Sequence, residues 1–505
     1  MKQVWVPLAA LVFMLAVGLV TYGHCVGDSL SRDEHQFVAP AILWAREGLV
    51  PYRDVPVFHQ PYMVYLYGAV GKTAASPLLA TRLVSGTAAF LTALLLFGCT
   101  WYATRAHPTG RRFLACVSIV LLWLTSHLFE VTSGRTWNHD LPCLLAVGAM
   151  ALLLFPPKLT RWHWLAAGLL AGLATGGRLT IAPFAGLLPL TALLWPGVSR
   201  RQKFSHLCSA GIGTALALLP SASLYLQSPD SYLFGNFEFP RLPLLAEDNS
   251  RILKTISPLR KIRYFFKELV RSNLPLALSM LGLLALYFRQ TQMSGANIKW
   301  LKRCRDLPWH WIVPPLALLA GAFAPSRYEM QHFYIVAPLA ALLAARALTG
   351  ASPRTIHGLA AAAVVSCALG ASVFAPALEL PRRKEWSITR IQRDAAKLRT
   401  AVPSGKVLTL APILPIEAGL SIYPQLATGR FGWKFAHLVP QPRREKLHLT
   451  AEEDLEAVVR AELPAAVLTG LEDAKLEKSI RRYAERNGYL PESLNDKVTL
   501  WIRPG

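Results

Sequence analysis

Carboxylates are the first residues of this 505-residue chain that could do chemistry. Asp28, Asp33 and Glu34 follow an apolar run near the amino terminus, and carboxylates beside a membrane are costly to desolvate. An ionised carboxylate can take a proton from an attacking hydroxyl or amine, or bind a metal ion. Adjacent residues cannot share one face of a helix, so we expect only one of the last two to enter a site, and we favour Asp33. A solvated loop is the alternative explanation for all three.

Three later groups add a second acid and several cations. Asp140 opens an apolar run, where it could equally be a helix cap. Arg178 lies in a glycine-containing turn between two apolar runs, and Arg327 and His332 precede another, where they would also suit a membrane interface. Guanidinium groups bind phosphate oxygens with paired hydrogen bonds. Together the groups suit a phosphate-bearing substrate and a nucleophile that must lose a proton.

The elements that must position these groups are apolar runs long enough to cross a bilayer. The chain is 53% hydrophobic and only 16% charged, whereas soluble domains have about 25% charged residues. A helix that crosses a bilayer core needs about 20 apolar residues. We predict eleven spans, at residues 4–22, 82–104, 113–130, 139–155, 162–176, 179–196, 205–226, 272–289, 309–325, 332–348 and 356–376.

The first run has a second interpretation, as a cleaved signal peptide. No small-residue cleavage site follows it, so we retain it as the first helix.

Basic residues are distributed unevenly between the predicted loops, and this sets the orientation. With the amino terminus inside, every inside loop is basic, including those that contain Arg200 and Arg303. The segment 228–271 is basic and outside, which long loops tolerate. All four groups then lie on the outer face. The net charge of +23 has the same origin, so it does not indicate nucleic-acid binding.

Residues 1–376 therefore form a predicted membrane domain, and residues 377–505 a folded domain outside it. Alternation of buried strands with a helix predicts that this tail is a small α/β domain. It contains no phosphate-binding loop, so we expect no catalytic groups of its own. The expected strands and helix are 406–410, 465–469, 471–487 and 497–503.

The first outer segment, residues 23–81, is too long for a simple turn. We predict two helices lying in the membrane interface, at 35–47 and 62–75. The seven cysteines are scattered without CxxC spacing, which argues against a disulfide framework and a zinc site.

Taken in order, these motifs resemble the multi-spanning GT-C glycosyltransferases. The branch they resemble most contains the protein mannosyltransferases and the lipid A aminoarabinose transferases. One departure is that the frequent Pro-Pro of that family is Gln60-Pro61 here. The residues that carry the resemblance are Asp33-Glu34, Gly48, Pro51-Tyr52, Gln60-Pro61-Tyr62, Asn138-His139-Asp140, Arg178 and His332-Phe333-Tyr334.

The resemblance implies transfer of a hexose or pentose, with inversion, from a polyprenyl-phosphate donor. The acceptor would be an envelope glycolipid, polysaccharide or protein at the outer face of the inner (plasma) membrane. It implies Asp33 as the base and Asp140 as a group that orients the base or acceptor. It further implies substrate binding by Glu34, Tyr62, Arg178, Arg327, His332 and Tyr334.

No nucleotide cofactor and no nucleic-acid partner are expected; the partners are the lipid donor, the acceptor and membrane lipids. A divalent metal shared by Asp33 and Asp140 stays open. Two other functions are alternatives: a transporter of lipid-linked sugars, or a non-catalytic partner of an envelope glycan complex. Transporters often place polar groups at mid-membrane depth in broken helices, whereas the ionisable residues here lie at span ends.

Overall fold

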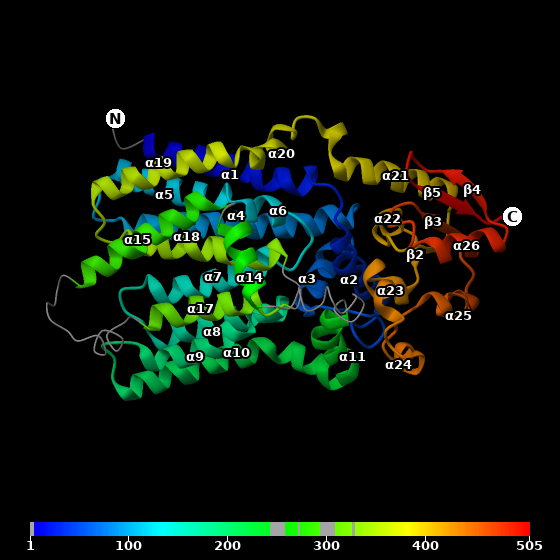
Figure 1. Cartoon of the computed structure of the whole chain (residues 1–505), viewed down its shortest axis with the longest axis horizontal. Helices are drawn as coiled ribbons and strands as arrows, with labels where there is room; N and C mark the ends of the chain where they lie inside the picture. Colours follow the sequence, from blue (N-terminus) through cyan, green and yellow to red (C-terminus); the bar gives the residue numbers. More distant parts are fainter. Residues whose placement is uncertain (1–4, 243–257, 271–272, 293–308, 326–328, 505) are drawn as a thin grey trace.

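The computed structural model describes residues 5–242, 258–270, 273–292, 309–325 and 329–504. These residues are mainly helical, with one small sheet near the carboxyl terminus. Long helices run side by side in a bundle, and the carboxyl-terminal part lies at one end of it (Figure 1). The amino terminus lies at the other end of the bundle. The predicted mainly α fold with a small sheet in its tail is confirmed.

Each of the eleven predicted apolar runs contains a helix of the bundle. Several begin at a serine cap, as where Ser76 precedes Pro77 and accepts the Leu79 N–H. The bundle helices are α1 (Trp5–Gly27), α4 (Pro77–Ala103), α5 (Thr109–Leu124), α7 (Asp140–Leu154), α8 (Arg161–Gly177), α9 (Ala182–Thr191), α10 (Arg200–Gln227), α15 (Leu274–Gln292), α17 (Trp309–Phe323), α18 (Val336–Ala347) and α19 (Pro353–Leu369).

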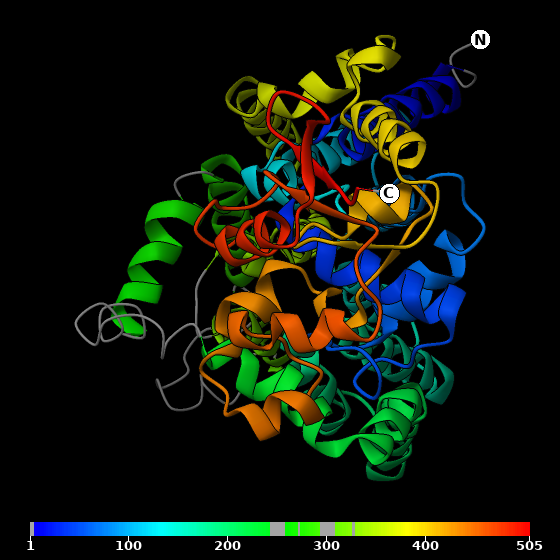
Figure 2. The ribbon, with the colours of Figure 1, turned by 90° about the vertical axis from the view of Figure 1, so that its right-hand side faces the viewer.

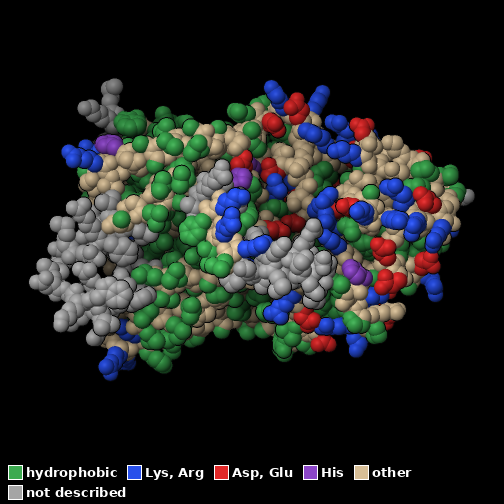
Figure 3. All heavy atoms as spheres, in the orientation of Figure 1, with side chains coloured by type: hydrophobic (Ala, Val, Ile, Leu, Met, Phe, Trp, Pro, Cys, Tyr) green, Lys and Arg blue, Asp and Glu red, His purple; other side chains and the backbone are tan. Residues whose placement is uncertain are grey.

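The described helices differ in their fitness to cross a membrane. By length and composition, α1, α4 and α10 qualify, and a fourth span results if α19 and the segment after it, bent by 73°, are counted as one. Several other helices are apolar but shorter, so the count of eleven spans stays a prediction. Apolar side chains cover much of the bundle in Figure 3, whereas charged side chains gather on the carboxyl-terminal part.

Short helices lie in the connections between the long helices of the bundle. They are η1 (Arg32–Glu34), α6 (His127–Thr132), α11 (Pro229–Leu233), α14 (Pro258–Tyr264), η7 (Met330–Phe333) and α20 (Ala375–Leu378).

Glycine allows α8 and α10 to approach closely. A Cβ added to Gly168 would collide with the carbonyl oxygen of Ala210, and one added to Gly213 would collide with that of Leu165. A Cβ on Gly172, one turn along α8, would lie 2.6 Å from the Ala217 side chain. Small residues at helical spacing permit such backbone contact in membrane bundles. This contact fixes α8, whose last residue precedes Arg178.

The first outer segment forms the two expected helices, α2 (His35–Glu47) and α3 (Tyr62–Gly71). Gly48 ends α2 in a left-handed conformation, with φ of 75°, that favours glycine. Every residue of α2 from His35 to Leu43 is buried. It packs in one apolar cluster with Leu78 of α4 and with residues of the carboxyl-terminal domain. The structure therefore encloses α2 within the protein, and its place relative to a membrane interface stays a prediction.

The carboxyl-terminal domain contains a five-stranded mixed sheet in the order β2-β1-β3-β5-β4. β1 is parallel to β2 and β3, and β5 is antiparallel to β3 and β4. The strands are β1 (Lys406–Leu408), β2 (Ser421–Ile422), β3 (Ala466–Thr469), β4 (Leu490–Ser493) and β5 (Thr499–Ile502). The helices are α21 (Ser387–Ala401), α22 (Ile413–Glu417), α23 (Arg430–Ala436), α24 (Gln441–Lys446), α25 (Leu455–Arg460) and α26 (Lys478–Arg486).

This domain lies over the end of the bundle, as Figure 2 shows from that side. Phe58 of the first outer segment stacks on Phe239 at 3.5 Å, and Phe435 of α23 meets Phe239 edge-on. The Glu417 carboxylate accepts the Leu78 N–H at 2.7 Å and so caps the start of α4. The apolar and polar contacts together attach the tail to the first outer segment.

Candidate active site

Asp33 lies in η1, at the end of the bundle that the carboxyl-terminal domain covers. The turn is fixed by Ser31, whose hydroxyl accepts the Asp33 N–H at 3.3 Å. The Asp33 carboxylate is half-buried, and within the described residues it accepts no hydrogen bond and forms no ion pair. Burial, with Glu329 and Glu34 nearby, raises the pKa of Asp33 to about 6. A carboxylate with that pKa suits a general base near neutral pH.

Glu34 is buried and used by the protein itself. Arg82 of α4 donates two hydrogen bonds to its carboxylate, at 2.7 and 2.6 Å, and the Thr136 N–H donates a third at 2.9 Å. Burial opposes ionisation, but the charge and hydrogen bonds of Arg82 outweigh it and hold the pKa of Glu34 below its ordinary value. The prediction that Glu34 binds substrate is untested; the geometry favours a positioning part, in which it fixes the turn that carries Asp33.

Arg82 joins three segments around this turn. Its remaining N–H groups donate to the backbone carbonyls of Cys25, Asp28 and Ser29, at 2.8 to 3.2 Å. Sequence reasoning missed Arg82 because it is the first residue of a predicted apolar span. Asp28, from the same acidic group, is paired with Arg135 at 3.1 Å.

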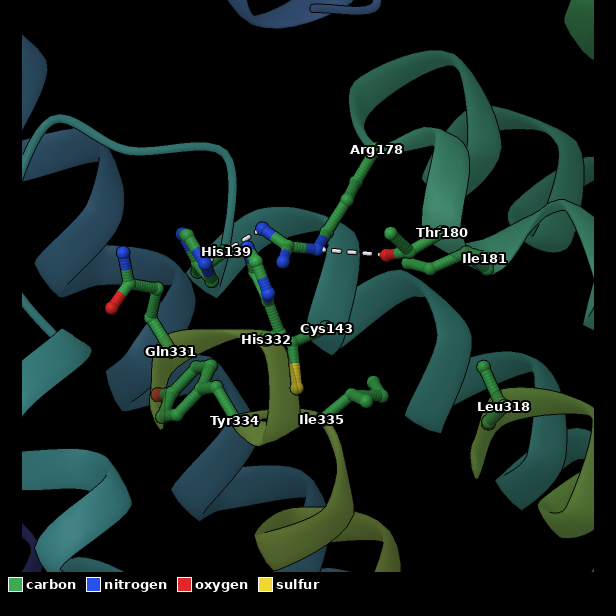
Figure 4. Close-up of a pocket in the computed structure, with 10 residues that line it drawn as sticks. All are labelled: His139, Cys143, Arg178, Thr180, Ile181, Leu318, Gln331, His332, Tyr334 and Ile335. Carbon is green, nitrogen blue, oxygen red and sulfur yellow. Dashed lines mark hydrogen bonds between the residues drawn. The ribbon is translucent and has the colours of Figure 1, made fainter. Parts of the chain in front are cut away.

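Asp140 and Tyr334 meet although 194 residues separate them in sequence. The Tyr334 hydroxyl donates to one Asp140 oxygen at 2.7 Å, and the Gly134 N–H donates to the other at 3.1 Å. Both side chains are buried, and Tyr334 also lines the pocket drawn in Figure 4. Asp140 therefore orients its neighbours through two fixed hydrogen bonds.

Arg178 extends into the same pocket, where Figure 4 shows its guanidinium between His139 and Thr180. It donates to the Thr180 hydroxyl at 2.9 Å, to the Asn138 amide oxygen at 3.0 Å and to His139 Nε2 at 2.6 Å. All three partners are uncharged polar groups, and no carboxylate of the described residues pairs with Arg178. Burial lowers the pKa of Arg178 to about 10, so it stays charged. A half-buried cation without a counter-charge favours an anionic ligand.

The structure places His332 in the pocket with Arg178, whereas Tyr62 does not line this pocket. His332, in η7, lines the pocket. The Tyr62 hydroxyl donates to the Ala217 carbonyl, and its ring packs on the backbone of Gly176, two residues before Arg178. Arg327 lies outside the described residues.

His59 and Gln36 were not expected from the sequence. His59 stacks on Phe37 at 4.8 Å and bonds Gln36 through its Nε2 at 3.0 Å. Burial, and then the charge of Arg178, lower the pKa of His59 to about 3, which keeps the ring neutral. The only signal in the sequence was that His59 and Gln36 are polar residues of the long first outer segment. Among the described residues, no group of three or more His, Cys, Asp or Glu is arranged to hold a metal ion.

Comparisons with known proteins identify the fold. No protein-family model matches the chain, and no curated protein matches it in sequence. The structure is similar to that of ArnT from Cupriavidus metallidurans bound to undecaprenyl phosphate, with a TM-score of 0.60 and 15% identity over 99% of this chain and 98% of that one. For the same protein in the apo state the TM-score is 0.59, at 13% identity, covering 98% of each chain.

A more distant similarity is to the oligosaccharyltransferase of Archaeoglobus fulgidus, with a TM-score of 0.42 and 14% identity over 93% of this chain and 70% of that one. The ArnT structures alone identify the fold. ArnT is a lipid A aminoarabinose transferase of the GT-C type, so the resemblance inferred from the sequence motifs is confirmed at the level of the fold, over nearly the whole chain.

Proposed function

We propose that this protein is an inverting membrane glycosyltransferase that uses a polyprenyl-phosphate sugar as donor. One observation carries the proposal. In an ArnT-like fold, a half-buried carboxylate suited to act as a base and a guanidinium that pairs with no carboxylate of the described residues lie at the same end of the bundle. The ArnT structure with the same fold contains undecaprenyl phosphate.

The reaction is a single displacement. Asp33 takes the proton from an acceptor hydroxyl or amine as that atom attacks the anomeric carbon of the donor. The bond from this carbon to the phosphate oxygen breaks, and the lipid phosphate leaves with the electron pair. Arg178 stabilises the charge that develops on the phosphate, which is usually the largest contribution to catalysis.

The other residues support these two. Tyr334, held by Asp140, and His332 line the pocket beside Arg178 and would contact the phosphate or the sugar. Arg327 is proposed as a second phosphate-binding cation. The protein would lie in the inner membrane with eleven spans, and Asp33 and the carboxyl-terminal domain would face outward. The acceptor would be an envelope glycolipid, polysaccharide or protein.

The test uses the full chain in proteoliposomes with a panel of undecaprenyl-phosphate hexoses and pentoses and an envelope lipid extract as acceptor. Mass spectrometry measures free undecaprenyl phosphate and the sugar transferred. We expect release by the wild type and none by D33N. The matched control is D230N, because Asp230 is an exposed aspartate on α11. Movement of intact donor across the bilayer without its cleavage would favour a transporter and overturn the proposal.

A further inference from the structure

One buried carboxylate of the carboxyl-terminal domain contacts the element that carries Asp33. Glu472 Oε2 lies 3.3 Å from Arg32 Nε and 3.3 Å from Arg430 Nη1. Arg32 belongs to η1 together with Asp33, and Arg430 is the first residue of α23. We call these three side chains the Arg32–Glu472–Arg430 bridge. It joins two segments that are more than 390 residues apart in sequence.

The backbones also meet at this point. Gly429, just before Arg430, has a φ of 58°, and a Cβ built on it would lie 3.5 Å from the His35 Cβ at the start of α2. The carboxyl-terminal domain is therefore in contact with the residues on both sides of Asp33, not only with the rim of the bundle.

The bridge differs from an ordinary docking ion pair. Arg443 of the carboxyl-terminal domain and Glu238 of the part of the chain before it form such a pair at 2.8 Å, and each side chain is 44% exposed. The Glu472 side chain is 0% exposed, and its Oε1 has no hydrogen-bond partner within the described residues. Burying a carboxylate is costly unless its charge is used. Here the charge of Glu472 holds two arginines in place beside Asp33.

We propose that Glu472 and Arg430 are positioning residues of the active site, which fix η1 and set the charge around Asp33. The proposal rests on the proposed role of Asp33 as the base. It makes the carboxyl-terminal domain a working part of the site, although neither residue need touch the substrate.

Opposite charge effects follow for the two residues. Among the described residues, the charged groups that act on Asp33 include Glu34 in its own turn, Arg135 before α7, Glu329 before η7 and Arg430 from the tail. Removing the cation of Arg430 makes an acid at position 33 harder to ionise. Removing Glu472 leaves Arg430 and Arg32 without their counter-charge and makes the same acid easier to ionise. A purely structural contact would shift neither.

The test places a thiol at position 33 of the full chain, in the D33C variant, and needs no substrate. Peptide mass spectrometry measures how fast iodoacetamide alkylates this thiol at a series of pH values. We expect the midpoint to rise in D33C/R430Q and to fall in D33C/E472Q, each by roughly half a pH unit to one unit in this half-buried place. D33C/R430K, which keeps the charge, and D33C/R443Q, which removes the docking arginine, should match D33C alone.

Unshifted midpoints, or shifts in the same direction, in D33C/R430Q and D33C/E472Q would overturn the inference. With a donor in hand, the acid limb of the pH–rate profile should move to higher pH in R430Q and to lower pH in E472Q. If D33N abolishes transfer while the midpoints stay fixed, the proposed function stands and the bridge has no positioning role. If the midpoints shift as expected while wild type transfers no sugar, the charge coupling stands and the proposed function falls.

Discussion

Asp33 combines partial burial with two neighbouring carboxylates, and this combination decides its protonation. Because its pKa is raised to about 6, it is mostly ionised at pH 7 and protonated below pH 6. A base must be ionised to act, so the transfer rate should fall as the pH is lowered through about 6. The measurement is kcat/KM against pH, because this ratio reports the pKa of the base in the free enzyme. A rate that is constant down to pH 4.5 would exclude Asp33 as the base.

The substitution D33N should abolish turnover and leave expression and lipid binding intact. The amide keeps the size of the side chain but cannot accept the proton, and a general base contributes about 100- to 10,000-fold in rate. Single-turnover assays with purified donor measure this, with D230N as the control. Near-normal turnover would make Asp140 the next candidate.

Arg178→Ala should weaken donor binding as well as turnover, because a cation that holds the phosphate acts before and during its departure. A charge-assisted hydrogen bond contributes about 1.5–3 kcal/mol, so affinity for undecaprenyl phosphate should fall roughly tenfold or more. R178K should recover part of it, since it keeps the charge but loses the paired geometry. Titration with the lipid phosphate measures the affinity. R201A, at an exposed arginine of α10, should have no effect.

The Arg82–Glu34 pair should matter for stability more than for chemistry. E34Q leaves a charged Arg82 buried without its partner, and breaking a buried pair costs about 3–5 kcal/mol. We expect a lower melting temperature, with turnover less affected than in D33N. The double variant R82M/E34L should be more stable than either single variant, because it removes both charges. Equal melting temperatures of E34Q and wild type would contradict the role of the pair.

At the scale of the element, the contact of α8 with α10 determines where Arg178 lies. G213A adds a methyl group that collides with the Leu165 carbonyl, whereas nothing lies within 4 Å of a Cβ on Gly211 in the same helix. Forced overpacking costs about 1–3 kcal/mol. G213A should therefore lower both the melting temperature and the affinity for the lipid phosphate, and G211A should lower neither. Identical behaviour of the two variants would show that this contact does not position the site.

The elements also show what could be predicted from the sequence. The boundaries of α2 were predictable because an amphipathic run ends at Gly48, which takes the left-handed conformation of a helix stop. β2 was missed because it has two residues, and β4 because it is exposed and contains Pro491. The helix expected at 471–487 begins only at Lys478, since Glu477 instead accepts the N–H groups of Gly470 and Glu472.

The site was predictable where its residues stand out from their local sequence. Asp33, Asp140 and Arg178 are charges at the ends of apolar runs, and the loop charges predict that they share the outer face, which stays a prediction. Arg82 and Glu472 could not be found in this way. One lies in an apolar run and the other in an ordinary charged tail, and only the fold brings each beside η1.

At the scale of the whole molecule, the bridge requires that Asp33 and the carboxyl-terminal domain lie on the same side of the membrane. We predict that both face outward. A cysteine replacing Glu462, an exposed residue of the tail, should react with a membrane-impermeant maleimide in intact cells. A cysteine replacing Arg201, at the start of α10, should react only after permeabilisation. The reverse labelling pattern would invert the topology and the proposed active face.

The cap that Glu417 places on α4 has a consequence for how the protein is made. The Leu78 N–H that this carboxylate accepts is translated 339 residues earlier. During synthesis, Ser76 can already cap the first turn of α4 by accepting the Leu79 N–H, but the Leu78 N–H gains its Glu417 partner only after α22 has emerged. Arg32 likewise waits for Glu472. We therefore expect this end of the bundle to be completed only once the last quarter of the chain has been made. A ribosome that stops early should yield a protein in which the end of the bundle that faces the carboxyl-terminal domain stays unfinished and accessible to proteases.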